Sequence, residues 1–174
     1  MTQSQVIGIG DCAVSDNPET SLVTYALGSC IAVLIHDPVA RVGGLLHYML
    51  PDSNLDKAKA NVRPAMFADT GIPLLFHQAY GLGAVKANLI VAVFGGAQVM
   101  DANETFNIGK RNHLALRKIF WRAGILARCE DVGGVLARTV RLDIADGQIT
   151  LRQGLNQQVF RSSGNEKKEA FHGV

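Results

Sequence analysis

Three side chains in the first third of the chain could act together as a nucleophile, its base and a group that orients the base: Cys30, His47 and Thr24. A cysteine attacks as the thiolate. Because a free thiol has a pKa of about 8.5, a neighbouring imidazole must take its proton or stabilise the ion pair. The hydroxyl of Thr24 could bind one ring nitrogen and so orient the imidazole. The alternative is structural, because a lone cysteine in an apolar strand is more often a small buried hydrophobic residue.

Two apolar segments, 30–36 and 41–50, are predicted to be the strands that position the cysteine and the histidine. The first is rich in β-branched residues, and the intervening Asp37-Pro38-Val39-Ala40 is a turn signal. A turn centred between Pro38 and Val39 places Cys30 directly opposite His47, with Cβ atoms about 4.5–5.5 Å apart. A register shift of one residue would send the two side chains to opposite faces, so the catalytic hypothesis depends on this register.

Four small residues are candidates for lining the same site. Gly28 and Ser29 precede the cysteine and predict a turn whose backbone N–H groups could point at an oxyanion. The apolar run 88–94 predicts a strand covered on both faces, and it stops at Gly95 and Gly96. Such a glycine pair often lets another backbone or a ligand come close, although a plain turn is the alternative.

The remaining pattern is that of a mixed α/β chain. Apolar residues at helical spacing predict one long helix that begins at Asp69 or Thr70, either of which could cap it, and a second over 108–123. The dipeptide Asp146-Gly147 between two apolar segments predicts a β-hairpin. This order of elements indicates an α/β domain with much antiparallel pairing.

Composition limits the classes of function. The chain has 174 residues, 48% hydrophobic and 18% charged, as expected of one globular domain. We expect that domain over 1–160 and a polar, disordered tail over 161–174. A net charge of +2 favours binding neither to nucleic acid nor to a membrane surface. No segment has the length of a membrane span or the pattern of a signal peptide. These features predict a cytoplasmic protein. Three cysteines without a CxxC spacing predict neither a disulfide framework nor a metal site.

The predicted helix over 108–123 carries five cations on faces other than its apolar stripe: Lys110, Arg111, Arg117, Lys118 and Arg122. A basic helix face is usually solvated surface, and no aromatic platform for stacking bases lies nearby, so nucleic-acid binding is not expected. Trp121 on the same helix is interpreted either as the edge of the core or as part of a partner surface.

The segment 24–51, TYALGSCIAVLIHDPVARVGGLLHYMLP, resembles the CheD family of chemoreceptor glutamine deamidases. Further matches follow in order at 68–75 (ADTGIPLL), 94–97 (FGGA), 108–112 (IGKRN), 130–134 (EDVGG) and 138–149 (RTVRLDIADGQI), so the resemblance runs from Val6 to about Arg152. The family uses a Cys-His-Thr triad, and its spacing points here to Thr24, Cys30 and His47. One departure is Ala137, where the family usually has glycine; it affects a local turn and not the triad.

The resemblance implies a layered α-β-β-α sandwich (α+β) with mixed, largely antiparallel sheets and two main helices. It implies hydrolysis of the side-chain amides of specific glutamines on methyl-accepting chemoreceptors, through a cysteine thioester and without a metal or organic cofactor. It also implies a partner, the CheC phosphatase, that competes with the receptor. Two alternatives remain open: a non-catalytic adaptor that binds receptors or stimulates CheC, and a receptor methylesterase or amidase that uses the same triad.

Overall fold

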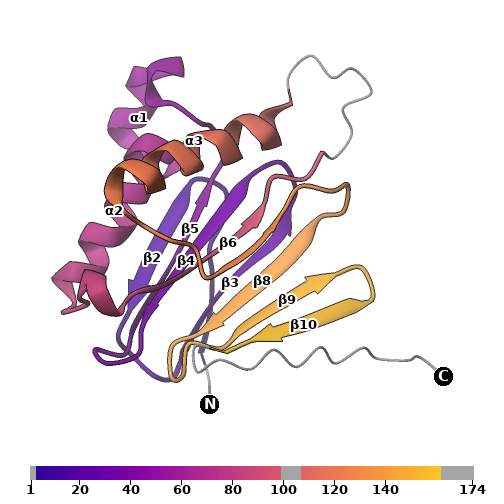
Figure 1. The fold of residues 1–174 in the computed structure, drawn as a ribbon. Helices are drawn as coiled ribbons and strands as arrows, with labels where there is room; N and C mark the ends of the chain where they lie inside the picture. Colours follow the sequence, from indigo (N-terminus) through magenta and orange to yellow (C-terminus); the bar gives the residue numbers. More distant parts are fainter. Residues whose placement is uncertain (1–2, 99–106, 162–174) are drawn as a thin grey trace.

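The computed structural model describes residues 3–98 and 107–161, which form two five-stranded sheets packed face to face (Figure 1). The first sheet has the order β1 (Gln3–Val6), β3 (Thr20–Leu27), β8 (Arg138–Asp143), β9 (Ile149–Gln153) and β10 (Asn156–Phe160). The second has the order β2 (Asp11–Ser15), β5 (Val42–Tyr48), β4 (Ile31–Asp37), β6 (Ile90–Gly95) and β7 (Cys129–Val132). Only the pairs β1–β3 and β6–β7 are parallel, which confirms the prediction of mixed, largely antiparallel sheets.

The helices lie on the side of the second sheet that faces away from the first, and the two long helices pack on its strands (Figure 1). They are α1 (Lys57–Val62), α2 (Ala68–Gly81) and α3 (Ile108–Ala123), with short 3-10 turns η1 (Ser53–Leu55), η2 (Pro64–Met66) and η3 (Lys86–Asn88). Both long helices connect strands of that one sheet, α2 between β5 and β6 and α3 between β6 and β7. In the described residues no helix covers the outer face of the other sheet, so the observed order of layers is α-β-β. The layered α+β sandwich is confirmed, and the fourth layer of the predicted α-β-β-α order is not found in this part of the chain.

Strand β4 belongs to two cores, which explains why its sequence is apolar without interruption. Ile31, Val33 and Ile35 pack against the helices, whereas Ala32 and Leu34 face the other sheet. Successive side chains of a strand point to opposite faces, so a strand that is covered on both faces is apolar at successive positions. All residues of β4 and β5 are buried.

The register of the β4–β5 hairpin differs from the predicted one. Asp37 pairs with Val42 and Ala32 with His47, so four residues rather than two form the loop. The Asp37 carboxylate stabilises this longer loop by accepting hydrogen bonds from the backbone of residues 39 and 40 at 2.8 and 2.9 Å, and Arg41 adopts a positive φ of 55°. The prediction that Cys30 lies directly opposite His47 is therefore wrong by two positions. Because two is an even number, Cys30 and His47 stay on the same face of the sheet.

The two long helices differ in how well they were predicted. Helix α3 has the predicted bounds and ends at Gly124, which adopts the left-handed conformation with a φ of 62°. Helix α2 begins one or two residues earlier than predicted, and no side chain caps it. Asp69 instead accepts hydrogen bonds from the backbone N–H and hydroxyl of Ser53, and the Thr70 hydroxyl donates to the carbonyl of Pro64.

The predicted C-terminal tail, 161–174, lies outside the described residues except for its first residue. Within residues 3–98 and 107–161, no helix combines the length and the apolar character needed to cross a membrane.

Candidate active site

A hydrogen bond between the two sheets joins two of the three predicted catalytic residues. Thr24 projects from β3 of the first sheet and His47 from β5 of the second, and Thr24 Oγ1 lies 2.8 Å from His47 Nδ1. Both side chains are buried, with exposed fractions of 0% and 2%. The contact orients the imidazole and leaves Nε2 as the ring nitrogen that can exchange a proton with a neighbour.

Cys30 immediately precedes β4 and packs with the core between the two sheets, as Ala32 does. Since Ala32 is the direct partner of His47, Cys30 is a diagonal neighbour of the histidine. Cα atoms in this relation are about 7–8 Å apart and their side chains point to the same side, so a long side chain reaches across. His47 Nε2 is buried and makes no hydrogen bond in the part of the chain that the structure describes, so it remains available to accept the thiol proton.

Burial shifts the pKa values of the thiol and the imidazole in opposite directions. It raises the pKa of Cys30 to about 11, and the residue's own backbone N–H offsets part of this rise. It lowers the pKa of His47, against the smaller opposing effects of the Ile7 backbone and the Asp11 carboxylate. Both shifts favour the uncharged form, so the resting state at neutral pH is a neutral thiol beside a neutral imidazole. If Cys30 is the nucleophile, its thiolate would therefore form by proton transfer, and His47 is the neighbouring base that could accept the proton.

The glycine pair at the end of β6 supports the segment that carries the cysteine. Gly96 N–H donates to the carbonyl of Cys30 at 2.8 Å, and Ala97 N–H donates to the carbonyl of Gly28 at 2.8 Å. Gly95 adopts a φ of 114°, and a Cβ at this position would collide with the Cys30 carbonyl oxygen. The close approach predicted for this pair is thus to the backbone of Cys30, the predicted nucleophile. Because the Gly96 N–H is already bonded, an oxyanion could use it only by displacing the Cys30 carbonyl.

Asn112 of α3 ties together the two strand ends that carry the cysteine and the histidine. Its Nδ2 donates to the carbonyl of Ser29 at 3.1 Å and to the carbonyl of Met49 at 2.8 Å, and the side chain is fully buried. Sequence reasoning gave this residue no role. The available signal was an amide at one end of the buried stripe of α3, four residues before Leu116.

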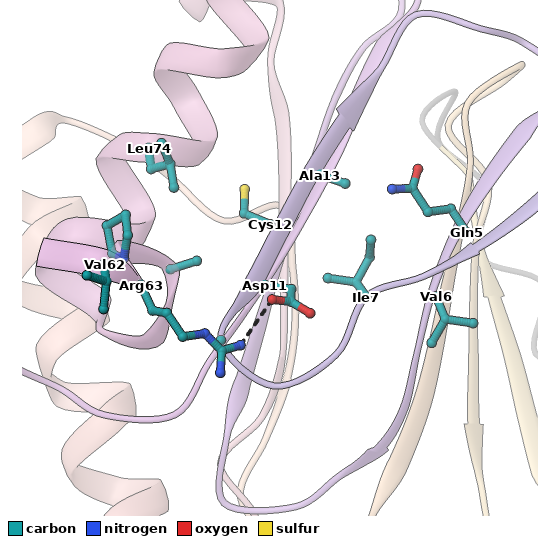
Figure 2. A pocket seen from close by; sticks show the side chains of 12 residues that line it. Gln5, Val6, Ile7, Asp11, Cys12, Ala13, Val62, Arg63 and Leu74 are labelled. Atoms are coloured by element: carbon teal, nitrogen blue, oxygen red, sulfur yellow. Dashed lines mark hydrogen bonds and ion pairs between the residues drawn. The ribbon is translucent and has the colours of Figure 1, made fainter. Parts of the chain in front are cut away.

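A hollow of about 400 Å³ lies beside β2, on the flank of the sheet next to the site (Figure 2). Asp11, the strand partner of His47, lines it and forms an ion pair with Arg63 at 3.1 Å. None of the three predicted catalytic residues lines this hollow. The described residues contain no group of three His, Cys, Asp or Glu side chains that could hold a metal ion.

A cysteine on the same sheet face as a histidine whose second nitrogen binds a hydroxyl is an arrangement suited to cysteine hydrolases. Residues 49–153 match the family model CheD, described as CheD chemotactic sensory transduction. The chain is 54% identical over 162 residues to a protein of Solibacter usitatus named probable chemoreceptor glutamine deamidase CheD, covering 93% of this chain and 96% of that protein. It is also 54% identical over 147 residues to probable chemoreceptor glutamine deamidase CheD 1 of Syntrophus aciditrophicus, covering 84% and 92%. The chain belongs to the CheD family.

Among solved structures, a hypothetical protein of Bacillus licheniformis, YfiH, is similar with a TM-score of 0.38 and 13% identity, over 69% of this chain and 49% of that chain. A score this low supports no functional argument.

Proposed function

We propose that this protein hydrolyses the side-chain amides of glutamine residues on methyl-accepting chemoreceptors. The observation that carries the proposal is the 2.8 Å contact between Thr24 Oγ1 and His47 Nδ1, on the sheet face to which Cys30 also belongs. The names of the relatives, probable chemoreceptor glutamine deamidases at 54% identity, support glutamine amides as the substrate.

The reaction follows from the roles of the three side chains. Thr24 accepts a hydrogen bond from Nδ1–H, so that Nε2 of His47 carries the lone pair and takes the proton from Cys30. The thiolate attacks the carboxamide carbon, and ammonia leaves with the proton held by His47, which produces a thioester. Water, deprotonated by the same imidazole, cleaves the thioester to glutamate, and the proton returns to the sulfur. Gly28 and Ser29 are proposed to hold the tetrahedral oxyanion through backbone N–H groups, a contribution worth about 10²–10³ in rate per donor in other enzymes.

Each cycle converts a neutral amide into a carboxylate, which adds one negative charge to the receptor and provides a glutamate that can be methylated. Added charge on a helical surface increases repulsion between like-charged neighbours and thereby alters helix packing. We further propose a cytoplasmic location and the CheC phosphatase as a partner that competes with the receptor for the site. The resemblance to the family supports both proposals.

Peptide-level mass spectrometry of a soluble chemoreceptor cytoplasmic fragment incubated with the protein tests the proposal. We expect the mass gain of amide-to-acid conversion at particular glutamines with the wild type, and none with Cys30→Ala or His47→Ala. Thr24→Val removes the hydroxyl but keeps the side-chain shape and should slow the reaction, whereas Thr24→Ser should restore it. Binding without any mass change indicates the adaptor, and loss of methyl esters without deamidation indicates the methylesterase. A gain that survives Cys30→Ala would show that the nucleophile is elsewhere.

A further inference from the structure

Three cations of α3 form one straight row along the helix: Arg111, Lys118 and Arg122. Spacings of seven and eleven residues bring side chains back to the same face of an α-helix, and at 1.5 Å per residue the row is about 16 Å long. The three side chains line a hollow of about 500 Å³, whose opposite wall includes Pro51 and Asp52. We call this hollow, with its row of cations, the α3 groove.

Three cations and two carboxylates, Asp52 and Asp69, line the α3 groove, so its described lining carries a net charge of +1. Asp52 accepts hydrogen bonds from the backbone and side-chain nitrogens of Asn54 at 2.8 and 2.9 Å, and Asp69 accepts two from Ser53 at 2.9 and 2.6 Å. Both carboxylates are thus held by neutral donors and not by the three cations. The three cations are exposed and form no ion pair inside the described part of the chain. An unpaired row of like charges is electrostatically unfavourable until an acidic partner approaches.

The groove begins near the strand ends that carry Cys30 and His47, on the helix-covered side of the sheet, whereas the two side chains lie on its other face. Arg111 is followed by Asn112, whose amide donates to the carbonyls of Ser29 and Met49. Pro51, in the opposite wall, is two residues beyond Met49. A polypeptide that lies in the groove therefore ends next to the segment that carries the nucleophile.

We propose that the α3 groove binds an acidic α-helix of the protein whose glutamines are hydrolysed. A straight cationic row over three helical turns matches carboxylates repeated at the same period on a helix that lies alongside. Leu114, about half exposed in the same wall, offers an apolar contact between the charges. This inference rests on the proposed function and specifies how the substrate is held.

Charge reversal on the same helix provides a matched test. Lys118→Glu/Arg122→Glu acts inside the groove, whereas Lys110→Glu/Arg117→Glu makes the same change in net charge on another exposed face of α3. We expect the groove variant to weaken binding of a soluble chemoreceptor fragment about tenfold or more, because two surface ion pairs are lost and two repulsions replace them. The control should stay within about twofold of wild type. Lys118→Gln/Arg122→Gln should give an intermediate loss, and the alkylation rate of Cys30 should be the same in all variants.

Binding measured in the Cys30→Ala background, as a function of salt, separates this inference from the proposed function. If the wild type does not deamidate but the groove variant still binds more weakly than the control, the groove stands and the enzyme assignment fails. Equal losses in the groove and control variants would overturn the groove, even with deamidation intact. Failure of the fragment to bind the Cys30→Ala protein at low salt would also overturn it.

Discussion

Replacing Asn112 by alanine tests whether α3 holds in place the strand ends that carry Cys30 and His47, the proposed nucleophile and base. The Asn112 amide donates to the carbonyl of Ser29, which is adjacent to Cys30, and to the carbonyl of Met49, two residues after His47. Alanine removes both hydrogen bonds, which are part-buried, and leaves the two carbonyl oxygens without this partner.

The distances and the burial set the size of the effect. A hydrogen bond contributes about 0.5–1.5 kcal/mol net, so the two together stabilise the fold by about 1–3 kcal/mol. The side-chain oxygen of Asn112 has no hydrogen-bond partner among the described residues, and its removal recovers part of that loss. We therefore expect the free energy of unfolding to fall by about 1–3 kcal/mol in Asn112→Ala. Asn112→Asp should cost more, because a carboxylate oxygen would then face the two carbonyls.

Urea unfolding measures the loss of stability, and alkylation of Cys30 by iodoacetamide under native conditions reports on the position of the thiol. Both the unfolding free energy and the alkylation rate should change in Asn112→Ala. Arg117→Ala, on the exposed side of the same helix, should change the unfolding free energy by no more than about 0.5 kcal/mol. An Asn112→Ala protein with wild-type stability and wild-type alkylation kinetics would refute the reasoning.

Two further predictions concern the glycine beside the nucleophile and the protonation of the base. Gly95→Ala should lower the free energy of unfolding by about 1–3 kcal/mol more than Gly83→Ala. Both glycines have a positive φ, but only at Gly95 would an added Cβ collide with another atom, the Cys30 carbonyl oxygen. Equal losses of stability in thermal unfolding would contradict this close contact. Burial lowers the pKa of His47 below its ordinary 6.5, so the folded protein favours the neutral imidazole. The contribution of His47 to the free energy of unfolding is therefore complete above pH 6.5 and is lost as the pH falls through the pKa of the folded state. For one histidine, the free energy of unfolding changes by at most about 1.4 kcal/mol per pH unit. Urea unfolding between about pH 7 and 5 should show a smaller pH dependence in His47→Gln than in the wild type. An unchanged pH dependence would mean that the histidine is not buried in its neutral form.

Elements that depend on local signals were predicted well from the sequence. Helix α3 has the predicted bounds because its apolar stripe is regular and a glycine that can adopt the left-handed conformation follows it. The β8–β9 hairpin surrounds Asp146-Gly147 as predicted, and Gly147 has a φ of 70°. In both cases the residues that decide the structure are neighbours in the chain.

The geometry of the site depends on contacts that no local pattern encodes. The hairpin register follows from the choice of a four-residue loop, which requires a positive φ at Arg41 and two backbone hydrogen bonds to Asp37. The Thr24–His47 contact requires that two sheets pack face to face with the right offset. The sequence offered Thr24 as a hydroxyl that could bind the histidine, and the family spacing supported it, but no local pattern determines the offset of the two sheets that brings the two side chains together.

The even shift in register preserves the chemical hypothesis while changing its geometry. Direct opposition would have pressed the thiol against the imidazole in the resting protein, whereas the diagonal relation separates the two Cα atoms by about 7–8 Å. Burial acts in the same direction, because it raises the pKa of Cys30 and lowers that of His47, and so opposes a standing thiolate–imidazolium pair. Burial therefore disfavours the ion pair in the free protein. If Cys30 attacks an amide as proposed, the proton would pass to His47 as the sulfur bonds to the carbonyl carbon, and until then a protonated thiol would react slowly with oxidants and alkylating agents, because both reactions require the thiolate.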